Sequence, residues 1–92
     1  MAIIESIAVW DRLGLHLRAG AQLVKTLGGF QCQVRVSHGG RSVNAKSLLQ
    51  LLTLGAIYGT VLEFYVDGED APQAIEAIRN LLRTWGEAEL EE

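Results

Sequence analysis

The sequence has only one cysteine and one proline among its 92 residues. Because a disulfide needs two thiols, Cys32 excludes an intrachain disulfide, which agrees with a reducing compartment. Two histidines and one cysteine, far apart in the sequence, give little support for a metal site, so we expect neither a metal nor another cofactor. The N-terminal residues lack the basic region and the cleavage pattern of a signal peptide. We therefore expect a cytoplasmic protein.

A strong net charge is absent from most of the chain. Four of the eleven acidic residues lie in residues 87–92, so residues 1–86 hold eight basic and seven acidic side chains. Nucleic-acid binding favours a basic stripe, and an RNA-binding sheet also needs exposed aromatics, whereas only Tyr65 is expected on the outer side of its strand. We therefore predict one domain, residues 1–86, with a short acidic tail, residues 87–92, and no nucleic-acid partner.

The sequence also lacks an uninterrupted hydrophobic run long enough to be read as a membrane span. Residues 48–66 contain Glu63 as their only charge, but Gly55 and Gly59 interrupt them and the periodicity changes from helical to alternating. We interpret this segment as a helix, a turn and a strand, and we expect no direct membrane insertion.

Hydrophobic periodicity predicts seven elements in the order β-α-β-β-α-β-α. The first six elements cover residues 3–10, 17–27, 31–37, 41–44, 48–54 and 61–66. The last element is a helix with a capped start near Asp70 and Gln73, and it is predicted to stop at Gly86. Two strand–helix–strand units interleave when the last strand of one inserts between the strands of the other. We therefore expect an α+β open-faced sandwich, with a four-stranded, mostly antiparallel sheet and three helices on one face.

The most informative stretch is Gly14-Leu15-His16, followed by Arg18, at the expected start of a helix. The first backbone N–H groups of a helix have no partner within it, and the helix dipole favours an anion there. A neutral imidazole is a usable nucleophile near pH 7. This arrangement suits a histidine that carries a phosphoryl group, with Arg18 close enough to share its charge. Without such a role, Arg18 is an ordinary solvated helix residue.

Four motifs along the chain carry a resemblance to a known family: Gly14-Leu15-His16-x-Arg18, Val43-Asn44-Ala45-Lys46-Ser47-Leu48, Leu54-Gly55 and Gly68-Glu69-Asp70. In these motifs, and over residues 3–85 as a whole, the chain resembles the HPr family, the histidine phosphocarriers of the bacterial sugar phosphotransferase system. The resemblance implies the same open-faced sandwich.

The resemblance further implies that Nδ1 of His16 accepts a phosphoryl group from enzyme I and passes it to A-type components of enzyme II. The backbone amides of Leu17 and Arg18 and the side chain of Arg18 would stabilise the phosphate. The protein would then be a phosphoryl-carrying intermediate, expected to be a monomer, rather than an enzyme with its own small-molecule turnover.

The sequence departs from the family pattern just after the histidine. The family usually reads H-x-R-P-A, whereas Ala19 and Gly20 follow Arg18 here. Proline would pre-set the first helical turn, so we expect a less rigid loop, and Gly20 costs about 1 kcal/mol of helix propensity relative to alanine. Leu13 and Leu17 are also more apolar than is usual. These departures concern partner choice and transfer rate rather than the nucleophile.

Ser47 has two interpretations. Its hydroxyl suits the N-cap of the helix over residues 48–54. The resemblance also implies regulatory phosphorylation of Ser47 by HPr kinase and binding to a transcriptional regulator. The negative charge added by phosphorylation would oppose docking of enzyme I. A regulatory adaptor that works through Ser47 and exposed leucines is therefore the alternative to a phosphocarrier.

Five leucines in residues 48–54 cannot all face one core from a two-turn helix. Leu51 and Leu54 can point inward together, whereas Leu48 and Leu52 share another side. This predicts a small exposed apolar patch, unless a neighbouring loop buries the helix. Exposed patches mark partner surfaces, and the residues that we expect to contact partners are Leu17, Lys25, Leu48, Leu49 and Leu52.

Overall fold

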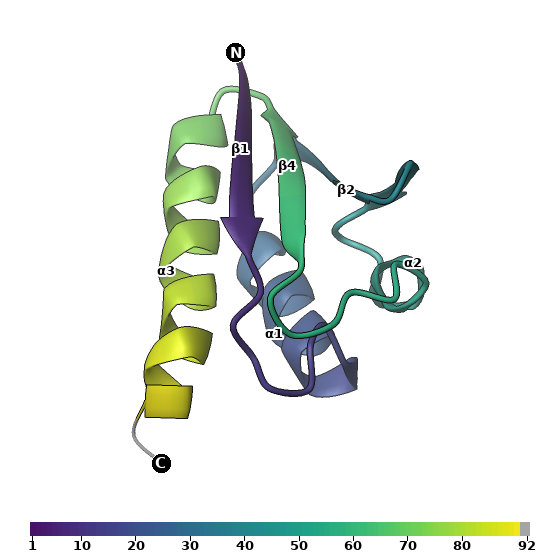
Figure 1. Cartoon of the computed structure of the whole chain (residues 1–92). Coiled ribbons are helices and arrows are strands. Elements are labelled where there is room, and N and C mark those ends of the chain that lie inside the picture. Colours follow the sequence, from purple (N-terminus) through teal and green to yellow (C-terminus); the bar gives the residue numbers. More distant parts are fainter. Residues whose placement is uncertain (91–92) are drawn as a thin grey trace.

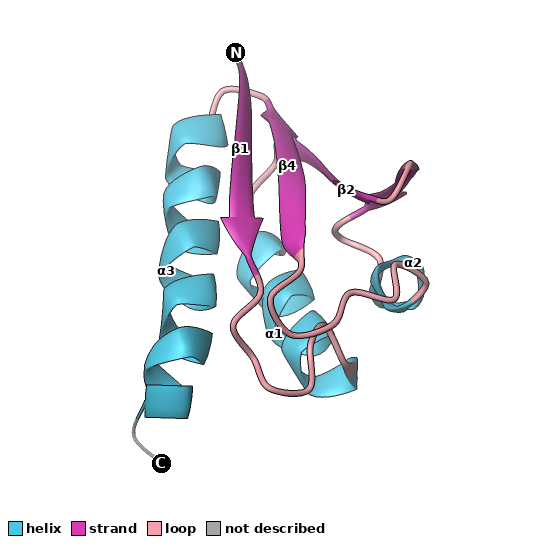
Figure 2. Ribbon diagram, viewed as in Figure 1, coloured by secondary structure: helices cyan, strands magenta, loops and turns pink. Residues whose placement is uncertain are grey.

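The chain alternates strands and helices in the order that the sequence predicts (Figures 1 and 2). This computed structural model describes residues 1–90, and its elements are β1 (Ala2–Ala8), α1 (Leu17–Leu27), β2 (Gln33–His38), β3 (Arg41–Asn44), α2 (Leu48–Leu52), β4 (Val61–Asp67) and α3 (Ala71–Leu90). The predicted limits of β1, β2, α2 and β4 are wrong by one or two residues.

The four strands form one sheet in the order β1-β4-β2-β3, and every neighbouring pair is antiparallel. Because β4 lies between β1 and β2, Tyr65 pairs with Ile4 on one side and with Arg35 on the other. In Figure 1, α1 lies behind β1 and β4, and α3 runs alongside β1. The predicted open-faced sandwich, with its helices on one face of the sheet, is confirmed.

Alternation along the strands separates the core from the open face of the sheet. In β4 the residues that face the helices are fully buried, whereas Val61, Glu63 and Tyr65 between them are exposed. Burying a large apolar side chain contributes roughly 1.5–3 kcal/mol to folding. The core joins the inner strand residues to the buried sides of α1 and α3, namely Val34, Val36, Leu62, Phe64, Val66, Ala19, Gly20, Leu23, Leu27, Ala74, Ile75, Ile78, Leu82 and Trp85.

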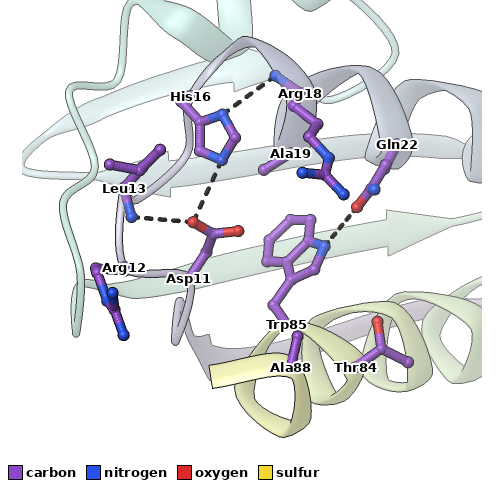
Figure 3. Close-up of a pocket in the computed structure, with 10 residues that line it drawn as sticks. All are labelled: Asp11, Arg12, Leu13, His16, Arg18, Ala19, Gln22, Thr84, Trp85 and Ala88. Carbon is purple, nitrogen blue, oxygen red and sulfur yellow. Dashed lines mark hydrogen bonds and ion pairs between the residues drawn. The ribbon is translucent and has the colours of Figure 1, made fainter. Parts of the chain in front are cut away.

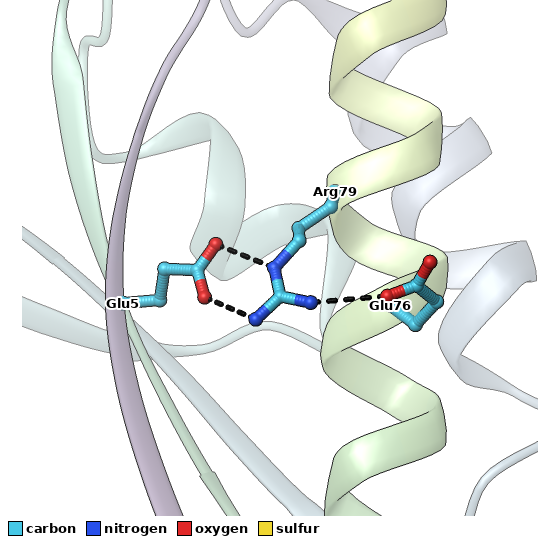
Figure 4. A network of polar contacts seen from close by, with 3 residues as sticks. All are labelled: Glu5, Glu76 and Arg79. Carbon is cyan, nitrogen blue, oxygen red and sulfur yellow. Dashed lines mark hydrogen bonds and ion pairs between the residues drawn. The ribbon is translucent and has the colours of Figure 1, made fainter.

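Glu5 interrupts the apolar alternation of β1, and an ion pair explains why it is tolerated (Figure 4). Arg79 of α3 donates from Nε to Glu5 Oε2 at 2.7 Å and from Nη2 to Glu5 Oε1 at 2.6 Å. Its remaining Nη1 donates to Glu76 at 3.0 Å. These hydrogen bonds from Arg79 hold the pKa of Glu5 below its ordinary value. The fork therefore fastens the edge strand to the last helix.

The predicted stop of the last helix at Gly86 is wrong, because α3 continues to Leu90. A Cβ at Gly86 would lie 3.4 Å from the Cβ of Trp10, so α3 packs on that side chain at van der Waals distance and the glycine does not interrupt the helix. The predicted acidic tail therefore begins inside α3, and residues 91–92 lie outside the described residues. Within residues 1–90, no helix combines the length and the apolar character that crossing a bilayer requires.

Asp70 precedes α3 as predicted, but its carboxylate does not cap that helix. Oδ2 accepts from the amide of Gln31 at 2.8 Å, and Oδ1 accepts from the amide of Cys32 at 2.9 Å. These bonds, the Gln31 amide first, lower the pKa of Asp70. Cys32 is buried, and its burial, with Asp70 beside it, raises the pKa of the thiol. Asp70 therefore ties the loop before β2 to the start of α3.

Candidate functional site

His16 is the N-cap residue of α1, as the sequence predicts (Figure 3). Its backbone is extended, and its Nδ1 accepts a hydrogen bond from the amide of Arg18 at 3.3 Å. The first amides of a helix lack partners within it, so Nδ1 points at the donors where an anion is most stable. This bond is long, and a phosphoryl oxygen can replace Nδ1 as its acceptor.

Asp11 is a member of the site that the sequence reasoning missed. Its Oδ1 lies 3.2 Å from Nε2 of His16 and accepts from the amide of Leu13 at 2.9 Å. The imidazole is therefore held between a carboxylate on one nitrogen and a helix amide on the other, with 26% of the side chain exposed. An aspartate that binds the amide two residues later is a common turn signal, but that signal does not reveal a contact with a ring five residues away.

Gly14 sets the approach of the histidine loop to the loop before β4. Its φ is +71°, in the left-handed region, and a Cβ there would lie 2.3 Å from the carbonyl oxygen of Ala56 and 2.8 Å from Cα of Ile57. Only glycine fits such an approach. The same carbonyl oxygen of Ala56 accepts from the amide of Leu15 at 2.9 Å. The loop that holds His16 is therefore fixed by backbone contact.

A cavity of about 620 Å³ opens beside the imidazole, between α1 and the last turns of α3 (Figure 3). Trp85 lines this cavity and donates from Nε1 to Oε1 of Gln22 at 2.7 Å. The guanidinium of Arg18 lines the cavity and has no ion pair or hydrogen bond to any residue between 1 and 90. An exposed cation beside a nucleophile at a helix N-terminus can hold a phosphoryl group.

Ser47 is the N-cap residue of α2, and its hydroxyl accepts from the amide of Gln50 at 3.4 Å. The capping interpretation is therefore confirmed. The nearby cations point elsewhere, since the ammonium of Lys46 donates to the carbonyl of Phe30 and Arg41 donates to the hydroxyl of Thr53. Phosphorylation of Ser47 stays a prediction.

The leucines of α2 divide as predicted only in part. Leu51 and Leu54 are buried, whereas Leu49 is 78% exposed. Leu48 and Leu52 are half-buried, because they pack towards α1 where it has no side chain: a Cβ at Gly20 would lie 2.9 Å from Cδ1 of Leu48.

Two further predicted contact residues lie exposed on α1. Leu17 follows the histidine and is 63% exposed, and Lys25 lies exposed two turns later on the same helix. The sequence reasoning missed Ile57, which is exposed in the loop that Gly14 contacts. Leu13, the residue before Gly14, is exposed as well. The exposed apolar side chains among these residues are therefore Leu13, Leu17, Leu49 and Ile57, and they do not form one face of α2.

Comparisons with known proteins point to one family. The family described as "PTS HPr component phosphorylation site" matches residues 4–84. The phosphocarrier protein HPr of Xylella fastidiosa (strain Temecula1) is 44% identical over 77 residues, which cover 84% of this chain and 86% of that protein. HPr of Haemophilus influenzae is 45% identical over 71 residues, 77% of this chain and 84% of that protein. The crystal structure of HPr-C-His from Thermoanaerobacter tengcongensis gives a TM-score of 0.87 at 31% identity, covering 91% of this chain and 94% of that one.

Proposed function

Since this chain belongs to the HPr family, the phosphocarriers of the phosphotransferase system, we propose that His16 accepts a phosphoryl group on Nδ1 from enzyme I. It then passes the group to an A-type component of enzyme II. The observation that carries this proposal is the position of Nδ1, 3.3 Å from the amide of Arg18 at the first turn of α1.

The transfer needs a nucleophile, a charge-stabilising pocket and little else. The lone pair of Nδ1 attacks phosphorus, the donor's bond to phosphorus breaks with its electron pair returning to the donor, and a bond between Nδ1 and phosphorus forms. The amides of Leu17 and Arg18 and the guanidinium of Arg18 then face the phosphoryl oxygens. We expect the stabilisation to be modest because Leu17 and Arg18 are exposed residues, and because a carrier must release the group that it binds.

The exposed apolar side chains near the site suit docking to larger proteins. We propose that Leu17, Leu48, Leu49 and Leu52 contact both partners, with Lys25 at the rim of that surface. Leu49 and Leu17 present the largest exposed apolar area of this set. In this proposal the chain is a cytoplasmic monomer. Its single His16 meets one partner at each transfer.

The test is incubation with phosphoenolpyruvate and purified enzyme I. We expect one acid-labile phosphate per chain, with ³¹P NMR placing it on Nδ1. His16→Ala abolishes the incorporation, and His38→Ala, which removes the other histidine at the end of β2, leaves it unchanged. A phosphate that survives acid, or incorporation that persists in His16→Ala, would contradict the proposal.

A further inference from the structure

The two ring nitrogens of His16 meet different chemical groups. Nδ1 accepts from a backbone N–H, that of Arg18, so it carries a lone pair and no proton. Nε2 lies 3.2 Å from Oδ1 of Asp11, and two lone pairs at that separation would repel. A proton on Nε2 turns this contact into an attraction. The neutral ring therefore favours one of its two tautomers, the one protonated at Nε2.

Asp11 is itself held in place, which gives the contact a fixed direction. The same Oδ1 accepts from the amide of Leu13 at 2.9 Å, and the following Gly14 cannot move away from Ala56 without losing its close backbone approach. The Asp11 side chain is 23% exposed and the His16 side chain 26% exposed. The carboxylate is therefore part of the turn that delivers the histidine to the start of α1.

We infer that Asp11 is a positioning residue, which keeps the ring proton of His16 on Nε2 and leaves Nδ1 as the nucleophile. This inference rests on the proposed function for its consequence, because the nitrogen left free is the one that would take the phosphoryl group. When the donor is a phosphorylated ring that also keeps its N–H, the phosphoryl group moves alone. The bond from the donor nitrogen to phosphorus breaks, the bond from Nδ1 to phosphorus forms, and no proton is transferred.

The carboxylate matters again after the transfer. The ring then carries phosphorus on Nδ1 and hydrogen on Nε2, so it is a phosphoimidazolium with a positive charge facing Asp11. Opposite charges at contact distance attract, and the contact fixes the ring plane for the next transfer. Asp11 does not touch the phosphoryl oxygens in this arrangement, since it lies at the other nitrogen of the ring (Figure 3).

Three substitutions of Asp11 separate the turn from the ring contact. Asp11→Asn keeps an acceptor oxygen for both the Leu13 amide and Nε2. Asp11→Ser keeps only the turn, because its shorter hydroxyl can accept from the amide two residues later but does not reach the ring. Asp11→Ala removes both. The backbone amide spectrum of each variant reports whether the fold is intact.

The first measurement is the ¹⁵N spectrum of the two imidazole nitrogens in the unphosphorylated protein, with His38 as the internal reference. We expect distinct proton-bearing and lone-pair nitrogens in the wild type and in Asp11→Asn, and resonances that move towards each other in Asp11→Ser and Asp11→Ala. The second measurement is the initial rate of phosphate acceptance from enzyme I. It should fall on the order of tenfold in Asp11→Ser and Asp11→Ala and stay within about threefold in Asp11→Asn.

Wild-type ring resonances in Asp11→Ser, or acceptance at the wild-type rate in that variant, would overturn the inference. A rate for Asp11→Asn as low as that for Asp11→Ala would also overturn it, because charge rather than position would then be the cause. If the wild type accepts no phosphate, the proposed function fails, and the nitrogen resonances still decide whether Asp11 sets the tautomer.

Discussion

The two ends of the sheet share two structural features, an aspartate that binds backbone amides and a glycine packed against another backbone, but they differ in how fully their polar groups are paired. Each end has an aspartate that accepts from backbone amides, Asp11 near His16 and Asp70 at the start of α3. Each end also has a glycine with positive φ pressed against another backbone. A Cβ at Gly14 would meet the carbonyl of Ala56 at 2.3 Å, and a Cβ at Gly68 would meet Cα of Cys32 at 2.8 Å.

The difference lies in how completely the polar groups are paired. Both oxygens of Asp70 bind amides at 2.8 and 2.9 Å. At the other end, one oxygen of Asp11 serves both an amide and an imidazole, Nδ1 of His16 makes a hydrogen bond of 3.3 Å, and the Arg18 guanidinium is unpaired within residues 1–90. Incomplete pairing next to a rigid turn leaves groups available for a ligand. The comparison thus separates a structural end of the sheet from the end that holds the proposed phosphate acceptor, which we call the reactive end.

The largest effects are expected from filling the two glycine positions. Gly14→Ala and Gly68→Ala combine a left-handed or strained backbone with a backbone clash, and each should lower the free energy of unfolding by about 3 kcal/mol. Only Gly14→Ala should also slow phosphate acceptance by His16, on the order of a hundredfold, because it displaces the loop that carries the ring. Chemical denaturation and the enzyme I assay, at a temperature where both variants are folded, measure the two effects.

Gly55→Ala is the matched control for Gly14→Ala. Gly55 also has positive φ, +64°, in a neighbouring loop, but a Cβ there meets nothing within 4 Å. It should lose only about 1 kcal/mol and keep the wild-type acceptance rate. Equal losses of acceptance in Gly14→Ala and Gly68→Ala would mean that the two ends are not functionally distinct.

The next effect concerns the unpaired cation of the reactive end. Arg18→Ala should lower the rate of phosphate acceptance about tenfold, because it removes the guanidinium that the proposed function places at the phosphoryl oxygens. Stability should change little, since the side chain is exposed. Arg83→Ala is the control, an exposed cation on α3 that lies outside the proposed docking surface. An equal slowing in both variants would assign the effect to the general positive charge of the protein instead.

The sequence predicted the features that local patterns determine, and it missed those that depend on contacts made in the folded protein. The order of the elements, His16 at the start of α1 and Ser47 at the start of α2 followed from local periodicity and capping patterns. Asp11, Asp70 and the course of α3 past Gly86 did not, because each depends on a neighbour that only the fold supplies. Asp70 reaches amides 38 and 39 residues away.

Gly20 is a residue whose role in the fold the sequence pattern also did not predict. By helix propensity it only weakens α1, at about 1 kcal/mol relative to alanine. In the fold it admits Cδ1 of Leu48 to a position 2.9 Å from where a Cβ would stand. A residue that looks unfavourable locally is therefore explained by packing between two helices, which no single-helix pattern contains.

A smaller effect is expected at the second helix start, where Ser47 caps α2. Ser47→Ala should lower the free energy of unfolding by about 1 kcal/mol through loss of the cap. It should leave phosphate acceptance by His16 within about twofold of the wild type, because the capping hydroxyl takes no part in the transfer. Thermal unfolding and the enzyme I assay test this, and Ser6→Ala, at an exposed serine in β1, controls for removal of a hydroxyl. A tenfold loss of acceptance in Ser47→Ala would instead make the start of α2 part of the reactive end.

The smallest effect is expected at the structural end, because Asp70 is solvent-accessible and its interactions are screened. Hydrogen bonds from the amides of Gln31 and Cys32 hold the pKa of Asp70 below its ordinary value. A carboxyl group with a depressed folded-state pKa contributes stability above its unfolded pKa of about 4, and this contribution is lost as the pH falls through the folded value.

Asp70→Asn should therefore flatten the decline of the unfolding midpoint below about pH 4, without slowing phosphate acceptance at neutral pH. Glu5→Gln is the parallel variant, since Arg79 lowers the pKa of Glu5, and the double variant should flatten the decline further. Thermal melts between pH 2 and pH 7 measure the slope. An unchanged slope in Asp70→Asn would mean that the amide contacts do not distinguish the charged carboxylate, and a slower transfer would mean that the two ends are coupled through the sheet.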